Sequence, residues 1–318
     1  MATLDEHISV SIIRLLIMLV SILGNTVILF AVLSHKQLRK TGANILLAQL
    51  AFADLIIGIA TGIRGISSIV FEQQGLVQYN KGLCLIIGSP TVFGIHLSQT
   101  TMMVIACDRL LCIRFPIQYR NMETSFFSFL RFFLCFGYSL IGTGIAYFSF
   151  PTRNEAIFVC STGNAVPLWY RTYYAVFGNT ITIAIYVFYI SIYVMFRRQR
   201  HKTKLGAQGS LFVTITAILS FYFFLCVLPN IAVVVGTVVE RDDANSEVAG
   251  YIALLLALGN GVNASINVFI YGWKHKELRN QLLKYRILRC LFGCCGKNAK
   301  LNVTVVTVVS KMRNSTNY

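Results

Sequence analysis

Charged residues are scarce in this 318-residue chain: Asp, Glu, Lys and Arg make up 13% of it, and only 12 residues are acidic. Soluble domains usually carry about 25% charged residues. With 56% hydrophobic residues and a mean hydropathy of +0.66, the composition excludes an ordinary soluble protein and favours a polytopic membrane protein. The net charge is +16, and the basic residues lie between the long apolar runs and in the tail, as membrane topology requires. We therefore expect no nucleic-acid partner.

Acids and histidines are rare within the apolar runs themselves. Asp54 is the only acid deep in such a run, and of the five histidines only His96 lies in one. A transporter or channel usually places several charges along a path or repeats broken helices in two halves, and no internal repeat is visible here. No nucleophile, base or metal-ligand set stands together, so we expect no enzyme; a transporter or channel is the less favoured alternative.

Seven apolar runs are long enough to cross a bilayer, which takes roughly 20 residues in a helix. The third is the most polar, with His96, Ser98 and Gln99, and polar side chains inside a membrane favour the interior of a bundle. The pattern predicts an all-α membrane protein, a seven-transmembrane helix bundle. The expected spans are Ile8–Leu33, Asn44–Phe71, Leu83–Ile113, Phe126–Phe150, Trp169–Phe196, Ser210–Val239 and Val248–Gly272.

The basic residues set the expected orientation. With the N-terminus outside, 22 of the 28 Lys and Arg residues fall on the cytoplasmic side, and most acids fall outside. This asymmetry predicts a multi-pass plasma-membrane protein with an extracellular N-terminus and a cytoplasmic C-terminus. The first residues carry no basic region and no small-residue cleavage site, so the first span is expected to be a retained anchor.

Four regions follow from this topology. We expect a short extracellular N-terminus over 1–7, the membrane bundle over 8–272, an amphipathic helix over 273–289 and a cytoplasmic tail over 290–318. Apolar residues recur at helical spacing in the third region, which suits a short helix lying on the membrane surface. They are Leu278, Leu282, Leu283 and Ile287.

Two of the nine cysteines fall on the outer side. Cys84 opens the third span, and Cys160 lies in the outer loop Pro151–Pro167. The exterior is oxidising, and no other cysteine is expected in an outer loop, so we predict a Cys84–Cys160 disulfide. Three more cysteines follow the amphipathic helix and are expected sites of palmitoylation, with free thiols as an equal alternative. They are Cys290, Cys294 and Cys295.

Several short motifs occur in a fixed order along the spans. Each alone is weak evidence, but their order and spacing together are specific and cover nearly the whole chain. They are Gly24-Asn25 in the first span, Leu47 to Leu55 in the second, Cys84 and Asp108-Arg109 at the two ends of the third, Phe115-Pro116 after it, Cys226 to Pro229 in the sixth, and Asn263 with Asn267 to Tyr271 in the seventh. With these residues the chain resembles the rhodopsin-like (class A) G-protein-coupled receptors.

Departures from the common pattern narrow this resemblance. Leu110 stands where a tyrosine usually follows Asp-Arg, Val227 stands where a tryptophan is usual, and Val268 replaces the proline of the seventh-span motif. The fourth span has no tryptophan and the fifth has no proline. In these features, and in the run Leu110 to Tyr119, the chain is similar to nematode serpentine chemoreceptors of the Srsx type. A diverged neuropeptide receptor is the near alternative.

The resemblance implies a two-state switch at the cytoplasmic end. At rest Asp108 would hold Arg109 by a charge-assisted hydrogen bond. On activation the sixth span, kinked at Pro229, would swing outward, Tyr271 would turn inward, and Arg109 would help to bind a heterotrimeric G protein. Leu205–Ser210 lacks the acid that often adds a second restraint, which predicts raised agonist-free signalling. The alternative for Asp108-Arg109 is a pair that only marks the membrane boundary.

The resemblance also implies a hydrated polar cluster around Asp54. An acid in a span costs about 2.5–3.5 kcal/mol on insertion scales, so Asp54 needs polar partners. Such oxygen ligands suit a hard cation, and we expect the cluster to be able to bind sodium, with no other cofactor. The alternative is a neutral aspartic acid with structural water. The expected sodium ligands are Asp54, Ser98, Asn263 and Asn267, with Asn25 beside them.

The ligand pocket is expected between the outer halves of the spans. By the same resemblance, Thr91 occupies the position of an amine-binding aspartate and Gly261 that of a retinal-binding lysine, which disfavours a monoamine receptor and an opsin. Arg64 would pair with an anionic group of an extracellular small molecule or peptide; snorkelling to lipid headgroups is an equal alternative. The expected pocket residues are Arg64, Thr91, His96, Tyr173 and Phe177.

Overall fold

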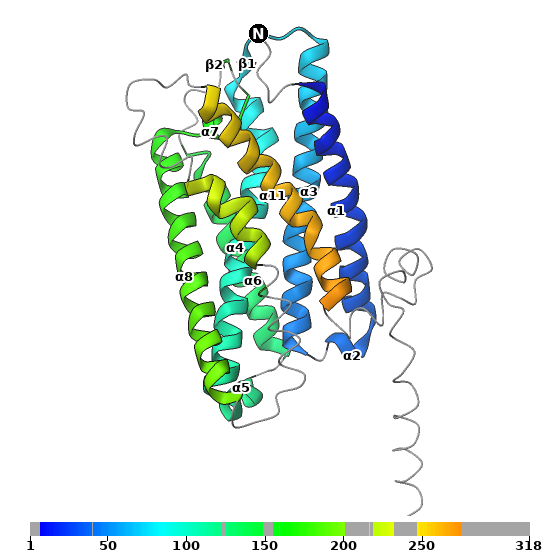
Figure 1. The fold of residues 1–318 in the computed structure, drawn as a ribbon. Coiled ribbons are helices and arrows are strands. Elements are labelled where there is room, and N and C mark those ends of the chain that lie inside the picture. Colours follow the sequence, from blue (N-terminus) through cyan, green and yellow to red (C-terminus); the bar gives the residue numbers. More distant parts are fainter. Residues whose placement is uncertain are drawn as a thin grey trace, which may run out of the picture.

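The computed structural model of the protein describes residues 7–39, 41–122, 125–148, 155–158, 160–200, 216, 219–231 and 247–274. Within these ranges the long helices run along one another as an elongated bundle (Figure 1). Five are long and apolar enough to cross a membrane. They are α1 (Ile8–Ser34), α3 (Gly42–Gln73), α4 (Lys81–Arg114), α6 (Ser125–Ile145) and α8 (Leu168–Arg200).

Two shorter apolar helices accompany them. Leu219–Ile231 contains the π-helix η3 (Phe223–Val227), and Leu254–Ile270 lies within α11 (Glu247–Lys274). They fall inside the sixth and seventh predicted spans. The predicted ends of the sixth span, Ser210 and Val239, lie outside the described residues.

The fourth span ends earlier than expected. We predicted it to continue to Phe150, but α6 ends at Ile145. The N–H groups of Ala146, Tyr147 and Phe148 each donate to the carbonyl three residues earlier, at 3.0–3.1 Å. Such bonds tighten the last turn of a helix, so the α-helix ends here although the sequence is still apolar.

Short elements connect the long helices. At one end of the bundle β1 and β2 pair antiparallel, with Tyr79 opposite Ile157. The ion pair between Lys81 Nζ and Glu155 Oε2, at 2.8 Å, lies beside this pair. The short elements are α2 (Lys36–Arg39), β1 (Tyr79–Asn80), α5 (Pro116–Met122), β2 (Ala156–Ile157) and α7 (Thr162–Ala165).

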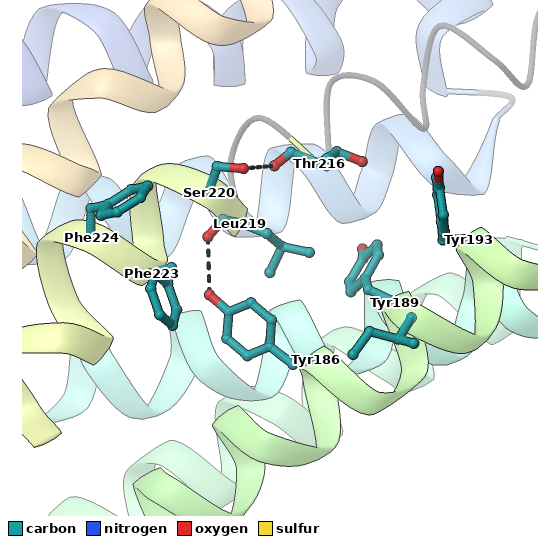
Figure 2. A pocket seen from close by; sticks show the side chains of 9 residues that line it. Tyr186, Tyr189, Tyr193, Thr216, Leu219, Ser220, Phe223 and Phe224 are labelled. Atoms are coloured by element: carbon teal, nitrogen blue, oxygen red, sulfur yellow. Dashed lines mark hydrogen bonds between the residues drawn. The ribbon is translucent and has the colours of Figure 1, made fainter.

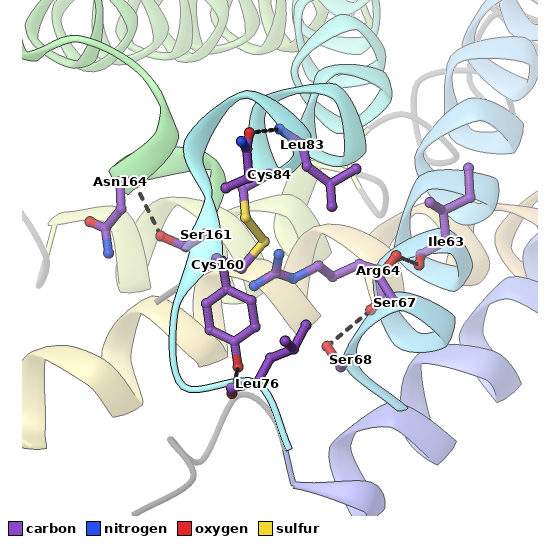
Figure 3. The surroundings of a disulfide bond; sticks show 12 residues. Ile63, Arg64, Ser67, Ser68, Leu76, Leu83, Cys84, Cys160, Ser161 and Asn164 are labelled. Carbon is purple, nitrogen blue, oxygen red and sulfur yellow. Dashed lines mark hydrogen bonds between the residues drawn. A yellow bond between two sulfur atoms is a disulfide. The ribbon is translucent and has the colours of Figure 1, made fainter. Parts of the chain in front are cut away.

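A disulfide ties the β1–β2 end to the start of α4. Cys84 and Cys160 are bonded, with their Cα atoms 5.3 Å apart, which confirms the predicted pairing (Figure 3). Asn80 caps α4 because its Oδ1 accepts a hydrogen bond from the Leu83 N–H at 3.1 Å. The two contacts hold the loop over the end of the bundle.

The outward faces of the helices are apolar and the inward faces carry small and polar residues. In water such a surface would drive aggregation, whereas the hydrocarbon core of a bilayer accepts it. On α1 the outward residues include Leu16, Leu19, Leu23 and Phe30, and the buried ones include Ser21, Gly24, Asn25 and Ile28.

α1 and α11 come close together where Gly24 meets Val268. A Cβ atom built on Gly24 would lie 2.7 Å from Cγ1 of Val268, so a larger residue at position 24 would push the helices apart. Val268 is the residue that replaces the usual proline. Its branched side chain fills the space beside Gly24, and unlike proline it keeps the N–H group that a helix needs.

Several predicted regions lie beyond the described chain. The described residues end at Lys274, so most of the predicted amphipathic helix 273–289 lies outside them. The tail 290–318, with Cys290, Cys294 and Cys295, lies outside it as well. Of the N-terminal region 1–7, only His7 is described, as the N-cap of α1.

Candidate functional site

The carboxylate of Asp108 gathers three side chains at the end of α4. Its Oδ2 accepts a hydrogen bond from Arg109 Nη2 at 2.5 Å, as the switch hypothesis requires. Its Oδ1 accepts from Arg131 Nη1 at 2.5 Å and from the Tyr119 hydroxyl at 3.1 Å. The Asp108 side chain is only 1% exposed, and the two guanidinium groups belong to side chains that are 15% and 10% exposed. One buried carboxylate is therefore shared between two cations.

Three helices bring this cluster together. Asp108 and Arg109 lie near the end of α4, Tyr119 comes from α5, and Arg131 from the second turn of α6. Arg131 is held further by Ser128 Oγ, 3.3 Å from Nη2, and by the Phe127 ring, whose centroid is 4.7 Å from the guanidinium carbon. This arrangement points Arg131 at Asp108.

The sequence pattern did not assign Tyr119 and Arg131 to the switch. Arg131 is one of the 22 cations on the predicted cytoplasmic side, although it lies five residues inside the predicted fourth span. A cation inside a span is costly unless it is paired, so that position was a usable signal. Tyr119 carried no comparable signal, because its place next to Asp108 depends on how α5 folds back.

The sixth helix is irregular just before Pro229. The π-helix Phe223–Val227 ends two residues before the proline. Proline has no N–H, and its ring clashes with the carbonyl four residues earlier, which here belongs to Leu225. That carbonyl faces Gly259 of α11 so closely that a Cβ atom on Gly259 would clash with its oxygen. The irregular turn and the close contact with α11 therefore occur at the same level of the bundle.

Tyr271 lies in α11, but its side chain is outside the described part of the chain, so its inward turn stays a prediction. By the resemblance to the class A receptors, its partner in the active state would be Tyr186 or Tyr189 of α8. The Tyr186 hydroxyl donates to the Leu219 carbonyl at 3.0 Å. The Tyr189 hydroxyl is buried and has no hydrogen-bond partner among the described residues, which leaves it available.

Asp54 is fully buried in α3 and joins three helices. Its Oδ2 accepts a hydrogen bond from Asn267 Nδ2 of α11 at 2.7 Å. Asn25 of α1 donates through Nδ2 to the Ala264 carbonyl of α11, at 3.1 Å, and to Ser21 Oγ, at 3.0 Å. Of the expected polar partners, Asn267 therefore bonds Asp54 directly, and Asn25 bonds the neighbouring helix α11.

Four buried side-chain oxygens in this part of the bundle have no hydrogen-bond partner among the described residues. Three are amide oxygens, which only accept, and the fourth belongs to the Asp54 carboxyl group, which only accepts when it is ionised. Burial of unpaired acceptors is costly, and water or a hard cation would satisfy them. Ser98, the other predicted ligand, is buried on α4. The four oxygens are Asn25 Oδ1, Asp54 Oδ1, Asn263 Oδ1 and Asn267 Oδ1.

His96, Tyr173 and Phe177 come together as predicted residues of the ligand site. His96 is 0% exposed, and the centroid of its ring lies 6.5 Å from that of Tyr173 and 6.0 Å from that of Phe177. Its Nε2 lies 3.4 Å from the Tyr170 hydroxyl. With Tyr138 of α6, these residues form a packed aromatic cluster between α4, α6 and α8. Thr91 lies on α4 five residues before His96 and is partly buried.

Two arginines lie near the disulfide end of the bundle. Arg64 of α3 extends toward the disulfide (Figure 3). Arg14, one of the six cations on the predicted outer side, is buried in α1 and donates to Ser68 Oγ at 3.4 Å. The Ser68 hydroxyl in turn donates to the Arg64 carbonyl at 3.0 Å. Positive charge is therefore built into this end on two neighbouring helices.

Two polar pairs that sequence reasoning missed connect the sixth helix to its neighbours. Gln99 Nε2 of α4 donates to the Tyr222 hydroxyl at 3.3 Å. Asn230 Nδ2 donates to Asn179 Oδ1 of α8 at 2.8 Å. Each pair spans two helices, so only the packing of the helices reveals it.

Comparison with known proteins agrees with this architecture. The family model of the serpentine type seven-transmembrane G-protein-coupled chemoreceptor Srsx matches residues 18–285. Adenosine receptor A3 of Ovis aries is 22% identical over 287 residues, covering 85% of this chain and 87% of the relative. Adenosine receptor A2b of Homo sapiens is 26% identical over 320 residues, covering 91% and 94%. Prokineticin receptor 2 of Rattus norvegicus is 30% identical over 172 residues, but this covers only 51% of the chain and 43% of the relative.

The matched family residues include both ends of the bundle, the disulfide and the Asp108 cluster. The protein is accordingly a multi-pass membrane receptor and not an enzyme. The chain belongs to the Srsx family of seven-transmembrane G-protein-coupled chemoreceptors.

Proposed function

We propose that this receptor binds a small extracellular chemical at the disulfide end of the bundle and activates a heterotrimeric G protein at the Asp108 end. The observation that carries the proposal is the buried Asp108 carboxylate, shared between Arg109 and Arg131. Because two arginines bind the same carboxylate, Arg109 can leave Asp108 while Arg131 keeps its charge paired. Outward movement of the sixth helix would then expose Arg109 to the G protein.

The proposed orientation places the N-terminus outside the cell and the C-terminus in the cytoplasm. Its support is the distribution of charge, with 22 of 28 Lys and Arg residues on the proposed cytoplasmic side. The disulfide agrees with it, because disulfides persist in an oxidising exterior. The Asp108 cluster then faces the cytoplasm, where a G protein is available.

The proposed ligand site lies between α4, α8 and the sixth helix. The pairs Gln99–Tyr222 and Asn179–Asn230 supply hydrogen-bonding groups there, and the aromatic cluster around His96 supplies apolar surface. This chemistry suits a compact molecule with a few polar groups. The names of the relatives include receptors for adenosine and for prokineticin, so a larger ligand is the alternative outcome.

An anionic group on the ligand has separate support. Arg14 and Arg64 lie on adjacent helices and share Ser68 near the disulfide end. A carboxylate or phosphate entering there would meet the guanidinium group of Arg64, and guanidinium groups bind such anions well. Loss of response to anionic compounds only, in Arg64→Ala, would support this extension.

We also propose sodium as a bound ion in the Asp54 cluster. The four unpaired acceptor oxygens support it, and a single carboxylate suits a monovalent cation. The ion would neutralise Asp54 and hold α1, α3 and α11 together. Ser98 would add its hydroxyl from α4.

The test is a signalling screen with a matched pair of variants. The full-length receptor is co-expressed with a promiscuous Gα subunit and challenged with water-soluble metabolites and with short peptides. Arg109→Ala should abolish the response to any active compound, whereas Arg114→Ala, an exposed arginine five residues further along, should retain it. Surface labelling of both variants controls for expression.

Three outcomes would contradict the proposal. One is a response that survives in Arg109→Ala at unchanged potency. Another is ion flux without G-protein activation in the same cells, which would favour a channel. A response to peptides alone would move the ligand class to the neuropeptide alternative.

A further inference from the structure

The sixth helix changes its hydrogen-bond register at the π-helix η3 (Phe223–Val227). The Leu228 N–H donates to the Phe223 carbonyl, five residues earlier, whereas an α-helix uses the carbonyl four residues earlier. The π-turn therefore accommodates about one residue more than an α-helical turn. Such turns are rare in proteins, so contacts with the neighbouring helices must favour this one.

Two hydrogen bonds hold the part of the sixth helix that precedes the π-turn. The Tyr186 hydroxyl of α8 donates to the Leu219 carbonyl at 3.0 Å (Figure 2). Gln99 Nε2 of α4 donates to the Tyr222 hydroxyl at 3.3 Å. The Tyr186 ring also packs edge-on against the Phe223 ring, with the centroids 5.9 Å apart. These contacts fix the rotation of this part about the helix axis.

The part that follows the π-turn has other partners. Asn230 Nδ2 donates to Asn179 Oδ1 of α8 at 2.8 Å. Within the turn, the Leu225 carbonyl lies directly against Gly259 of α11. Because different contacts hold the two parts, one of them can rotate while the other stays in place.

Conversion of the π-turn to α-helix has a defined geometric result. It adds about one residue of twist, about 100°, and about 1.5 Å of length. With the part after the turn fixed, each residue before it moves to about the place of the residue that precedes it. Tyr222 thereby leaves Gln99 and moves toward the place of Phe221, which is 43% exposed. Ser220, which is exposed, takes the place of the buried Leu219.

We propose that Gln99 and Tyr186 are positioning residues that hold the sixth helix in the π register, and that activation converts the π-turn to α-helix. The segment Leu219–Tyr222 then rotates by about one residue, while Pro229 and Asn230 keep their places. This regulation rests on the proposed function, because a ligand at the proposed site lies between Gln99 and Asn230, on the two sides of the turn. Such a ligand shifts the population of the two registers.

The register can be measured without ligand or G protein. Full-length receptor in phosphatidylcholine nanodiscs carries 3-fluorotyrosine in place of Tyr222, and fluorine NMR is recorded with and without a lipid that bears a nitroxide in its acyl chain. In the π register the label faces α4 and is shielded from the nitroxide. In the α register it faces lipid and relaxes faster.

Two glutamines give a matched pair of variants. Gln99→Leu removes the donor to Tyr222 and should increase the fast-relaxing population about three- to tenfold. Gln49 Nε2 donates to Thr101 Oγ1 at 2.9 Å, so it also joins two helices, but these are α3 and α4. Gln49→Leu should therefore leave the fast-relaxing population unchanged.

A deletion tests the π-turn itself. Phe224 is the outward residue of the turn, 65% exposed, and its removal makes the turn α-helical while both parts keep their present orientation. The variant should fold, and adding Gln99→Leu to it should produce no fast-relaxing signal. Leu255 is 60% exposed in α11, where the helix is regular and cannot absorb a deletion, so removal of Leu255 should prevent folding.

Two results would overturn the proposal. One is an equal fast-relaxing population in Gln99→Leu, in Gln49→Leu and in the unmodified receptor, with all three folded by thermal melting. The other is a folded Phe224 deletion that still responds to Gln99→Leu. If the deletion does not fold, Tyr186→Phe replaces it: this variant should also raise the fast-relaxing population, and an unchanged population would refute the change of register.

Agonist-free G-protein signalling of the same variants separates this proposal from the proposed function. Gln99→Leu should raise the signal by about the same factor as the fast-relaxing population. A change of register that leaves signalling unchanged would contradict the proposed G-protein function, whereas the fluorine measurement would still support the two registers of the turn.

Discussion

Replacing Arg131 with methionine should make the receptor harder to activate, because Arg131 shares the Asp108 carboxylate with Arg109. Arg131 and Arg109 bind the two oxygens of Asp108, each at 2.5 Å. When Arg109 leaves, Arg131 and Tyr119 keep the buried carboxylate paired. Without Arg131, release of Arg109 would leave Asp108 with one neutral hydrogen bond, so release would cost more.

The size of the effect follows from the charges. The two guanidinium groups share one carboxylate, so their centres lie about 6 Å apart, and at an effective dielectric of ~20 their repulsion is about 3 kcal/mol. Because both side chains keep 10–15% of their exposure, we halve this value for screening. Removing Arg131 then stabilises the bound form of Arg109 by about 1.5 kcal/mol, roughly a tenfold change in the equilibrium.

The assay is energy transfer between the receptor and a labelled G protein, without agonist and with any active compound. Arg131→Met should lower the agonist-free signal about tenfold and raise the half-maximal concentration of agonist by a similar factor, since the active state is less populated. Asp108→Asn should do the opposite, because it releases Arg109. Arg131→Lys, which keeps the charge, should restore part of the unmodified behaviour.

An Arg131→Met receptor whose agonist-free signal rises toward that of Asp108→Asn would refute the proposed role of Arg131. Arg131 would then act as a second restraint on the inactive state. Equal surface expression and equal melting temperature are required for the comparison, because Arg131 also packs on Phe127 and its loss can affect folding.

Three further predictions concern stability. Sodium at ten times its dissociation constant should raise the melting temperature of the purified receptor by about 3–6 °C, measured in sodium chloride against choline chloride. Asp54→Asn should abolish this difference, and equal melting of the unmodified receptor in both salts would exclude the ion. Gly259→Ala should destabilise the receptor by about 1–3 kcal/mol, because the added Cβ would clash with the Leu225 carbonyl. Gly144→Ala is the control, because a Cβ atom there meets nothing within 4 Å. The melting temperatures of the two variants are compared. Cys160→Ser should remove about 4 kcal/mol, because the disulfide closes a 76-residue separation, and surface expression should fall; unchanged expression and melting would contradict it.

The sequence alone was sufficient for the architecture because hydrophobic length, charge asymmetry and motif order are properties of the chain itself. A run of about 20 apolar residues must cross a bilayer as a helix, since every backbone polar group needs a partner inside hydrocarbon. The predicted Cys84–Cys160 bond also needed only topology and is confirmed. The end of the fourth span was misplaced because hydrophobicity does not show where the last turn of a helix tightens and the α-helix ends.

The composition of the sites was decided by packing. Asp108 and Arg109 are neighbours in the chain, so their pairing could be expected, but Arg131 meets them only because α6 packs beside α4. The pairing of Asn179 with Asn230 and the free hydroxyl of Tyr189 depend in the same way on how α8 lies against the sixth helix. Contacts between helices are set by the rotation and height of each helix, and these are settled by the packing of all the helices together, which local sequence does not encode.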